Sequence, residues 1–390
     1  MTTERLGTQA SPNGQALAAT SIRAMLEHQV GSGAFIAAKG FPPYHYSWLR
    51  DGSFVAFALD LAGEREAAER FHRWVATAIA AIAPTVREAT ERRLAGQGNE
   101  PSEMPPARFA LDGSVTSDDW PNFQIDGYGI WLWALGQHLL STDQHTVPET
   151  FRGSVERVGR YLDAFALSPC FDVWEESGSA LHTSTLACVY GGLAAAARML
   201  EDDSLLERAE SVQARARYSA IRLGRYVKST ESDEVDASIL WLSTPFLIVE
   251  PGDDFFAQTV LTIEAGLGLD GGLRRYPTDT YFGGGAWPVL TASLGWHYLA
   301  VGDFDAARRC KEWVAAQFDE SGRLGEQFGG ERRDPEHYRE WVDRWGPPAK
   351  DLTWSHAMYV VLCAALDDLG GSRGTGALIR ATRDQGRSVN

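Results

Sequence analysis

The sequence of 390 residues has little positive charge, few cysteines and no long apolar run. It contains 36 lysines and arginines against 52 aspartates and glutamates, so its formal net charge is −16 at pH 7. Nucleic acids and anionic membranes bind basic surfaces, and the acidic balance therefore argues against both as partners. No apolar stretch is long enough to cross a bilayer, and the polar N-terminus has no apolar signal segment.

The four cysteines lie far apart and lack the spacing of a metal site. They are Cys170, Cys188, Cys310 and Cys363. We interpret them as free, buried thiols, which persist in a reducing compartment. Together with the missing signal segment, this interpretation predicts a cytoplasmic protein.

Apolar residues recur at helical spacing in one segment after another, whereas alternating strand patterns are scarce. The predicted helices are 14–30, 51–62, 64–95, 126–141, 147–167, 182–200, 204–222, 233–243, 254–268, 286–301, 303–319 and 351–369. The main strand candidate is the short run 246–249. About twelve helices make six antiparallel pairs, which predicts an all-α fold.

The connections between these helices alternate between tight turns and long loops rich in glycine, proline and aromatic residues. The long loops are 31–50, 96–124, 169–181, 268–285 and 322–350. Long loops inside a compact domain are usually functional or disordered. We therefore predict an (α/α)6 barrel of six helical hairpins, with the active site at the mouth that the long loops line. The whole chain, 1–390, is expected to form this one domain, with a loose leader at 1–13 and a frayed tail at 371–390.

One run of residues combines acidic and aromatic side chains immediately before an apolar helix. It reads Asp-Val-Trp-Glu-Glu at 172–176, ahead of the helix predicted at 182–200. Acidic residues near a helix N-terminus complement its dipole, and this structural interpretation needs no further function. The functional interpretation is a catalytic acid, Glu175, beside a substrate-binding carboxylate, Glu176, and it requires a second catalytic carboxylate elsewhere.

Two earlier loops place charged groups among aromatic ones. Residues 44–51 read Tyr-His-Tyr-Ser-Trp-Leu-Arg-Asp, and residues 118–129 read Asp-Asp-Trp-Pro-Asn-Phe-Gln-Ile-Asp-Gly-Tyr-Gly. The acids at the two helix starts could simply be caps, and Trp120 could be a packed indole. The alternative is a sugar pocket, in which aromatic faces cover the pyranose ring while Arg50 and Asp51 bind hydroxyl groups.

The two later loops differ in their chemistry. The glycine-rich loop 271–287 lacks the Lys and Ser/Thr of a phosphate-binding loop and follows no strand. We interpret its glycines as sharp turns around a pocket. The last long loop contains Glu326 in a Gly-Glu-Gln run. Glu326 could be an exposed loop acid, or it could be the catalytic base that complements Glu175.

Five motifs occur in one order along the chain. They are Trp-x-Arg-Asp (48–51), Asp-x-Trp-Glu-Glu (172–176), Arg-Tyr-Pro-x-Asp-Thr-Tyr (275–281), Gly-Glu-Gln (325–327) and Asp-Leu-Thr-Trp-Ser (351–355). In these motifs and their order the sequence resembles glycoside hydrolase family 15, the glucoamylase family with glucodextranase-like and some trehalase-like members. The fold that this resemblance implies, an (α/α)6 barrel, agrees with the helix pattern.

The resemblance implies a role for each motif. Glu175 matches the family's general acid, Glu326 matches its general base, and Glu176 matches a neighbouring binding carboxylate. Arg50 and Asp51 match the pair that holds the terminal glucose. The further substrate-binding residues expected in and around these motifs are Tyr46, Trp48, Trp120, Gln124, Asp126, Trp174, Arg275, Asp279 and Trp287.

The family inverts the anomeric centre, which implies carboxyl groups about 6.5–9.5 Å apart. Glu175 has to carry a proton near neutral pH, and burial or the like charge of Glu176 would favour that form. Glu326 has to stay ionised and activate water on the opposite face of the sugar. The reaction needs no metal or organic cofactor, and the sequence shows no metal-ligand cluster.

For the whole protein, the resemblance implies an exo-acting glucosidase that releases β-glucose from the non-reducing end of short α-gluco-oligosaccharides. The chain has no room for the β-sandwich of many bacterial relatives and shows no starch-binding domain, which disfavours raw starch. The charged loop 328–350 could close the far side of the pocket. We therefore expect isomaltose-type α-1,6 links to be favoured.

Several alternatives stay open at this point. A glucoamylase-type α-1,4 hydrolase and an α,α-trehalase use the same kind of site. A phosphorylase or a sugar-binding protein without turnover is less favoured, because both catalytic carboxylates are present, although fold alone does not fix function. The sequence leaves the oligomeric state undetermined.

Overall fold

The computed structural model describes residues 12–118 and 120–366. Its helices are α1 (Pro12–His28), α2 (Leu49–Ala62), α3 (Arg65–Ala81), α4 (Ala83–Leu94), α5 (Asp126–Ser141), α6 (Glu149–Phe165), α7 (Thr183–Leu200), α8 (Asp203–Ser219), α9 (Asp254–Leu267), α10 (Pro288–Val301), α11 (Phe304–Ala315), α12 (Gly330–Arg333), α13 (Pro335–Trp345) and α14 (Thr353–Ala365). The predicted leader (1–13) and tail (371–390) lie outside the described residues, apart from positions 12 and 13, which open α1.

The connections contain short 3-10 helices and two-residue strands. The 3-10 helices are η1 (Pro42–Tyr44), η2 (Pro101–Glu103), η3 (Ala237–Leu242) and η4 (Tyr281–Gly283). The strands are β1 (Ser47–Trp48), β2 (Arg108–Phe109), β3 (Ile221–Arg222), β4 (Arg225–Tyr226), β5 (Gly268–Leu269) and β6 (Gly272–Leu273). They form antiparallel pairs, and the β1–β2 pair sets Trp48 opposite Arg108. This pairing joins the loop before α2 to the loop before α5.

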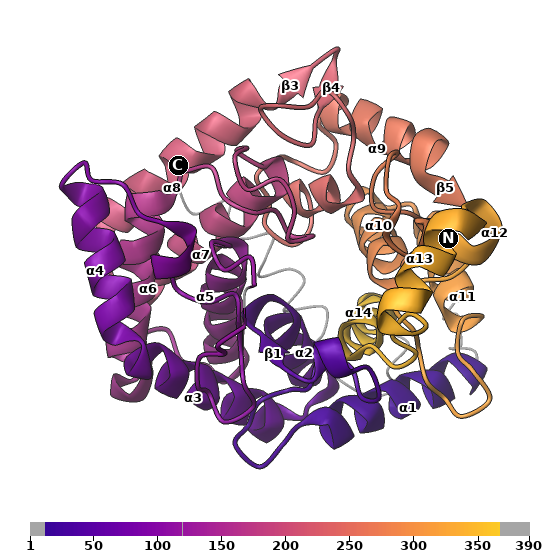
Figure 1. Ribbon diagram of the computed structural model, residues 1–390, viewed down its shortest axis with the longest axis horizontal. Helices are drawn as coiled ribbons and strands as arrows, with labels where there is room; N and C mark the ends of the chain where they lie inside the picture. The colour runs from indigo at the N-terminus through magenta and orange to yellow at the C-terminus, as the bar shows by residue number, and fades with distance from the viewer. Residues whose placement is uncertain (1–11, 119, 367–390) are drawn as a thin grey trace, which may run out of the picture.

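The helices form two concentric rings (Figure 1). The inner ring consists of α2, α5, α7, η3, α10 and α14, each packed against the next, and α14 closes the ring against α2. The outer ring consists of α1, α3, α6, α8, α9 and α11, and each outer helix precedes an inner element along the chain. This arrangement confirms the predicted (α/α)6 barrel.

Burial explains which helices lie inside. Every residue of α2 from Leu49 to Leu61 is buried, and so is every residue of α5 from Asp126 to Leu139. A helix that is buried on all sides needs neighbours on all sides. The outer helices α6 and α11 bury one stripe and expose the opposite face, which suits the outside of the barrel.

The connections position the site. Long connections lead from outer to inner elements, and mostly short ones, such as 63–64 and 302–303, lead back. The long loops therefore gather at the mouth where the inner helices begin (Figure 1). Helix N-termini carry partial positive charge, so this mouth favours acidic side chains and polar ligands.

The predicted helix 64–95 is two helices, α3 and α4, which meet at Ile82. This residue has φ −93° and ψ 14°, outside the helical range, and Pro84 lies in the first turn of α4. A proline inside a helix removes a hydrogen bond and clashes with the preceding turn. The prediction of one long helix is therefore wrong at this point.

Two predictions for the region around η3, the fourth element of the inner ring, are also wrong. The predicted helix 233–243 forms only η3, which Asp236 caps by accepting a hydrogen bond from Ser238 N. Pro245 disfavours the helical conformation for the residue before it, which limits the helix on its C-terminal side. The predicted strand 246–249 is irregular.

The segment 328–350, expected to be a long loop, contains α12 and α13. On α13, Tyr338, Trp341 and Val342 pack against the core. Their spacing of three and four residues is typical of an amphipathic helix. The charged residues between them conceal this pattern in the sequence.

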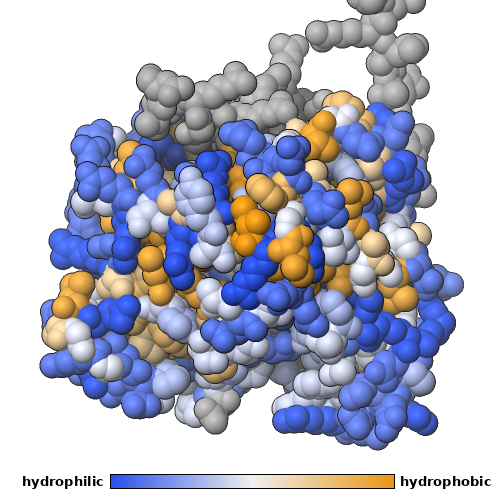
Figure 2. Space-filling view, turned by 90° about the horizontal axis from the view of Figure 1, so that it is seen from above, coloured by the Kyte–Doolittle hydropathy of each residue, from blue (hydrophilic) through white to orange (hydrophobic). Residues whose placement is uncertain are grey.

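The surface and the interior differ as the composition predicts. Hydrophilic residues cover most of the side that faces the top of Figure 1, with small apolar groups between them (Figure 2). All four cysteines are buried, and Cys170, Cys188 and Cys310 are free thiols, as expected. Within the described residues, no helix has the length and apolar character that a membrane crossing requires.

Candidate active site

The side chain of Asp172 shapes the turn at residues 172–176, called here the acidic turn, which precedes α7. Its Oδ1 accepts hydrogen bonds from the backbone N–H groups of Trp174 and Glu176, both at 2.9 Å. Glu175 lies between them with φ 69°, in the left-handed region that non-glycine residues rarely adopt. Backbone strain of this kind persists where the surroundings enforce it, often at functional sites. The turn therefore presents Glu175 in a fixed, unusual orientation.

The largely buried ammonium group of Lys228 supports this turn through ion pairs. Lys228 Nζ lies 3.4 Å from Asp172 Oδ2 and 3.3 Å from Asp236 Oδ2. Asp236 Oδ2 also accepts a hydrogen bond of 2.9 Å from Trp174 Nε1. Burial lowers the pKa of Lys228, but the two carboxylates outweigh this and leave it raised, so the group stays charged. The cation neutralises two acids that would otherwise repel each other.

The Glu175 carboxylate meets the first motif of the chain. Its Oε1 accepts a hydrogen bond of 2.7 Å from Trp48 Nε1 and lies 3.6 Å from Arg50 Nη2. Arg50 Nη1 in turn donates to Asp126 at 3.0 Å and to Gln124 at 3.2 Å. The guanidinium group is thereby fixed between buried acceptors and the carboxylate of Glu175.

Asp51 follows Arg50 and is buried at the same end of α2. Its Oδ2 lies 3.5 Å from Arg50 Nε. Burial raises the pKa of the Asp51 carboxyl to about 6, although the Arg50 charge opposes this rise. Asp51 Oδ2 has no hydrogen-bond partner among the described residues, so it can accept one from a ligand hydroxyl.

Glu176 belongs to a second group of charges on the other side of the turn. Its carboxylate accepts a hydrogen bond of 2.5 Å from Tyr276 OH and lies 3.4 Å from Arg275 Nη2. Arg275 is held by Asp279, to which Nε and Nη2 donate at 2.9 and 2.5 Å. This two-point contact fixes the plane of the guanidinium group.

Glu326 enters the mouth from the loop before α14. The residue is only 1% exposed, and its Oε1 accepts a hydrogen bond of 2.8 Å from Tyr44 OH. Burial raises the pKa of the Glu326 carboxyl to about 7, while the hydrogen bond from Tyr44 lowers it. Glu326 Oε2 has no partner among the described residues. A buried carboxyl oxygen with an open acceptor position is suited to hold a water molecule.

Glu175 and Glu326 face one shared group of aromatic residues. The Trp48 ring, which bonds Glu175, lies 5.6 Å between centroids from the Tyr44 ring, which bonds Glu326. Tyr44 OH and Tyr281 OH are 2.8 Å apart. Burial raises the pKa of Tyr281, and the charges of Glu326 and Glu175 raise it further. The two carboxylates are therefore linked through the neighbouring rings of Trp48 and Tyr44.

The comparisons with known proteins show the family of the chain. Residues 12–328 match the sequence profile of a family described as glycosyl hydrolases family 15. The chain belongs to this family. It is therefore a glycoside hydrolase, and the resemblance inferred from the five motifs is confirmed.

Individual relatives cover nearly the whole chain. An isomaltose glucohydrolase of Kribbella flavida is 37% identical over 362 residues, which make up 91% of this chain and 92% of the relative. A solved glycosidase structure in complex with glucose has a TM-score of 0.88 at 36% identity and covers 92% of this chain and 98% of that chain. A glucoamylase from Saccharomycopsis fibuligera has a TM-score of 0.66 at 14% identity over 99% of both chains, which shows a shared fold alone.

In this glycoside hydrolase, the residues predicted from the sequence all join one network at the mouth. Several predicted ligands lie behind the arginines as buried supports, namely Gln124, Asp126 and Asp279, whose exposures are 2%, 0% and 0%. Their contacts run to Arg50 and Arg275. Gln124, Asp126 and Asp279 thus orient the two arginines, and the arginines lie closer to the site than these acceptors do.

The predicted aromatic walls lie on two sides. Trp174 and Trp287 pack together with ring centroids 5.7 Å apart. On the other side the Arg108 guanidinium lies 4.1 Å from the Tyr46 ring and 3.5 Å from the Trp120 ring. Arg108 fixes both rings by cation–π contact, which an uncharged residue would not supply.

Sequence reasoning missed six residues of this network. They are Tyr44, Arg108, Lys228, Asp236, Tyr276 and Tyr281. The three tyrosines lie in the run 44–51 or in the motif 275–281, so their positions could have indicated that they belong to the site. Arg108, Lys228 and Asp236 lie in segments that carry no motif, and only the fold brings them to the site.

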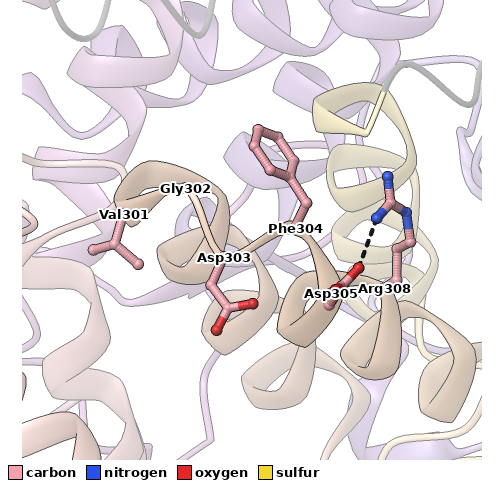
Figure 3. Close-up of a pocket in the computed structure, with 6 residues that line it drawn as sticks. All are labelled: Val301, Gly302, Asp303, Phe304, Asp305 and Arg308. Carbon is pink, nitrogen blue, oxygen red and sulfur yellow. Dashed lines mark hydrogen bonds and ion pairs between the residues drawn. The ribbon is translucent and has the colours of Figure 1, made fainter. Parts of the chain in front are cut away.

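A hollow in the surface lies at the other end of α10 (Figure 3). Its lining residues are Val301, Gly302, Asp303, Phe304, Asp305 and Arg308, and Arg308 pairs with Asp305 at 3.0 Å. The 14 residues of α10 separate this hollow from Trp287 by about 20 Å. It is therefore not part of the active site.

Proposed function

We propose that the protein is an exo-acting, inverting α-glucosidase that releases β-glucose from the non-reducing end of short α-gluco-oligosaccharides, with α-1,6 links of the isomaltose type favoured. The observation that carries the linkage is the likeness to an isomaltose glucohydrolase across nine-tenths of both chains. The glucose complex of a related glycosidase supports glucose as the sugar that the site binds.

In the proposed reaction, Glu175 donates a proton to the glycosidic oxygen as the bond from C1 to that oxygen breaks. Glu326 accepts a proton from a water molecule whose oxygen bonds to C1 on the opposite face. Free glucose of inverted configuration leaves, and exchange with solvent returns the proton to Glu175 and removes it from Glu326. The open acceptor position on Glu326 Oε2 supports its role toward water.

Substrate hydroxyls are proposed to bind the two charged groups beside Glu175. Arg50 and Asp51 form one group, and Glu176 and Arg275 form the other. Each arginine is oriented by buried acceptors, so its donors toward the site stay in place without a substrate. Trp48, Trp174, Trp287, Tyr46 and Trp120 would cover the apolar faces of the sugar rings.

The helix α13 supports a preference for short substrates. Its Trp341 ring lies 4.8 Å from the Tyr281 ring and 5.9 Å from the Phe282 ring, so α13 packs directly on residues of the site. We propose that this helix bounds the pocket and disfavours long glucans. The cytoplasmic location and the single domain over 1–390 stay predictions from the sequence.

A disaccharide panel tests this function. Glucose release is measured from isomaltose, maltose and trehalose, with Glu326→Gln as the inactive control. We expect the highest kcat/KM on isomaltose. Activity on maltose or trehalose without activity on isomaltose would contradict the linkage, and it would favour the α-1,4 hydrolase or the trehalase. No glucose from any sugar would contradict the proposal of a glucosidase.

A further inference from the structure

Three buried side chains with metal-binding chemistry meet at a distance from the active site. They are Asp60 on α2, His72 on α3 and His138 on α5, and each offers one ligand atom within 4.8 Å of the others. These residues are 12 and 66 positions apart in the sequence, without any metal-type spacing. Only the packing of two inner helices against one outer helix brings them together.

His72 is the residue that calls for an explanation. It is fully buried, and neither of its ring nitrogens has a hydrogen-bond partner among the described residues. Leaving a buried polar group unsatisfied costs free energy, and a bound water molecule or ion is one explanation for such a group. A neutral imidazole keeps a lone pair on one ring nitrogen, which can bind a ligand.

The other two residues already lie against each other. His138 Nδ1 is 2.9 Å from Asp60 Oδ1 and 3.1 Å from Oδ2. The His72 and His138 rings lie 5.2 Å apart between centroids. A carboxylate beside two imidazoles, one of them unpartnered, supplies one negative charge and two nitrogen ligands to the same small volume.

We propose that Asp60, His72 and His138 bind one divalent first-row transition-metal ion of the Zn²⁺ type. Imidazole nitrogen with carboxylate oxygen suits such ions, whereas Ca²⁺ and Mg²⁺ prefer oxygen alone. Coordination through His138 Nδ1 would replace its present hydrogen bond to Asp60, and the ring proton would then lie on Nε2. A water molecule supplies the fourth ligand.

The site is structural and separate from the glucosidase chemistry. Asp51 at the active site and Asp60 lie nine positions apart on α2, about 13 Å along the helix axis. An ion at Asp60 would tie α2, α3 and α5 together at the end of the barrel opposite the mouth. This inference does not depend on the proposed function, because its readout is metal content.

The test measures metal in the full-length protein. The chain is produced with Zn²⁺ in the medium, dialysed, and analysed for zinc per chain by mass spectrometry. We expect about one zinc per chain and, after replacement by Co²⁺, visible absorption of a site with nitrogen ligands. Removal of the metal by a chelator during partial unfolding should lower Tm by about 5 °C.

Two variants make the result specific. His72→Gln should abolish the bound zinc, whereas His337→Gln should leave it unchanged. His337 forms a partly exposed His–Asp pair with Asp334 at 2.8 Å, and among the described residues this pair belongs to no group of three metal-binding side chains. Zinc that persists in His72→Gln, or wild-type protein with no zinc and no change in Tm on chelation, would overturn the proposal. The wild-type measurement decides the matter even where His72→Gln fails to fold.

Discussion

At the scale of single residues, Glu326 combines deep burial with a role that requires charge. Burial raises the pKa of its carboxyl group to about 7, above its ordinary value of 4.5. A general base acts in the ionised form, so kcat/KM should fall as the pH falls below about 7. The sequence predicted an ionised Glu326 near neutrality, whereas the structure places the carboxyl group close to half protonation there.

The Tyr44 hydroxyl tunes this titration. Its hydrogen bond of 2.8 Å stabilises the ionised form of Glu326 and lowers the pKa. Tyr44→Phe should therefore move the acid limb of the kcat/KM–pH profile to higher pH. The matched control is Tyr298→Phe, which removes a Tyr–Glu hydrogen bond at the far end of α10. An acid limb that stays in place in Tyr44→Phe would contradict the assignment of Glu326 as the base.

Burial of Glu326 also costs stability in its charged form. The Glu326 carboxyl group has a pKa of about 7 in the folded protein and an ordinary pKa of 4.5 in the unfolded chain, so it stays protonated to a higher pH in the folded state. The folded state therefore binds more protons between these values, and stability falls as pH rises through them, by about 3 kcal/mol.

Glu326→Gln removes this dependence on pH. Urea denaturation at pH 8 should show the variant about 3 kcal/mol more stable than the wild type, with little difference near pH 4. The same stability difference at both pH values would show that Glu326 titrates normally in the fold.

Some residues of the site could be predicted from the sequence, and others could not. Glu175, Glu326 and Arg50 occur in motifs whose residue types match their chemistry, so they were predictable. Arg108 and Lys228 act through contacts with residues distant in sequence. No local pattern marks such residues, because their role exists only after the loops have met.

At the scale of elements, the acidic turn depends on Lys228. Lys228→Met would leave the carboxylates of Asp172 and Asp236 buried without their cation. We expect a loss of about 3–5 kcal/mol in the free energy of unfolding, together with a lower kcat, because Asp172 shapes the turn that carries Glu175.

Denaturation and turnover on isomaltose measure these two effects. The control is Lys350→Met, at an exposed position, which should change stability by less than about 0.5 kcal/mol. Lys228→Arg should restore part of both losses, because it keeps the charge. Equal effects of Lys228→Met and Lys350→Met would show that the buried cation does not hold the turn.

Helices with a strong apolar periodicity were predictable from the sequence. Elements in which a proline interrupts such a pattern were not. Pro84 divides one long apolar pattern into α3 and α4, and η3 replaces a full helix before Pro245. The helix α13 was missed for a different reason, since its apolar stripe is narrow and its charges dominate the composition. Both signals, the proline positions and the spacing of the apolar stripe, are present in the sequence.

At the scale of the whole molecule, the closed inner ring requires neighbouring inner helices to pack closely. Helices α5 and α7 pack closely at Gly129. A Cβ on Gly129 of α5 would lie 2.3 Å from the carbonyl oxygen of Cys188 on α7. Gly129→Ala should therefore destabilise the barrel by about 1–3 kcal/mol, although alanine is the better helix former.

The matched control lies on an outer helix. Gly153 on α6 is exposed and has nothing within 4 Å of an added Cβ. Gly153→Ala should stabilise the protein by about 0.5–1 kcal/mol. Urea denaturation measures both, and a stabilised Gly129→Ala would contradict the close packing of α5 against α7.

The barrel itself was predictable because six helix pairs alternate with long loops along the chain. The assignment of helices to the two rings follows from burial that the sequence shows only as continuous apolar composition in α5 and α10. The cluster of Asp60, His72 and His138 was not predictable, since three helices must be placed in space before its members become neighbours.

The most direct test of the central claim is the configuration of the first glucose released. Early-time proton NMR during isomaltose hydrolysis should show β-glucose before mutarotation. Glu175→Gln and Glu326→Gln should each lower the rate by about 10²–10⁴-fold. If α-glucose appears first, the reaction retains configuration, and Glu326 is not the base that activates water.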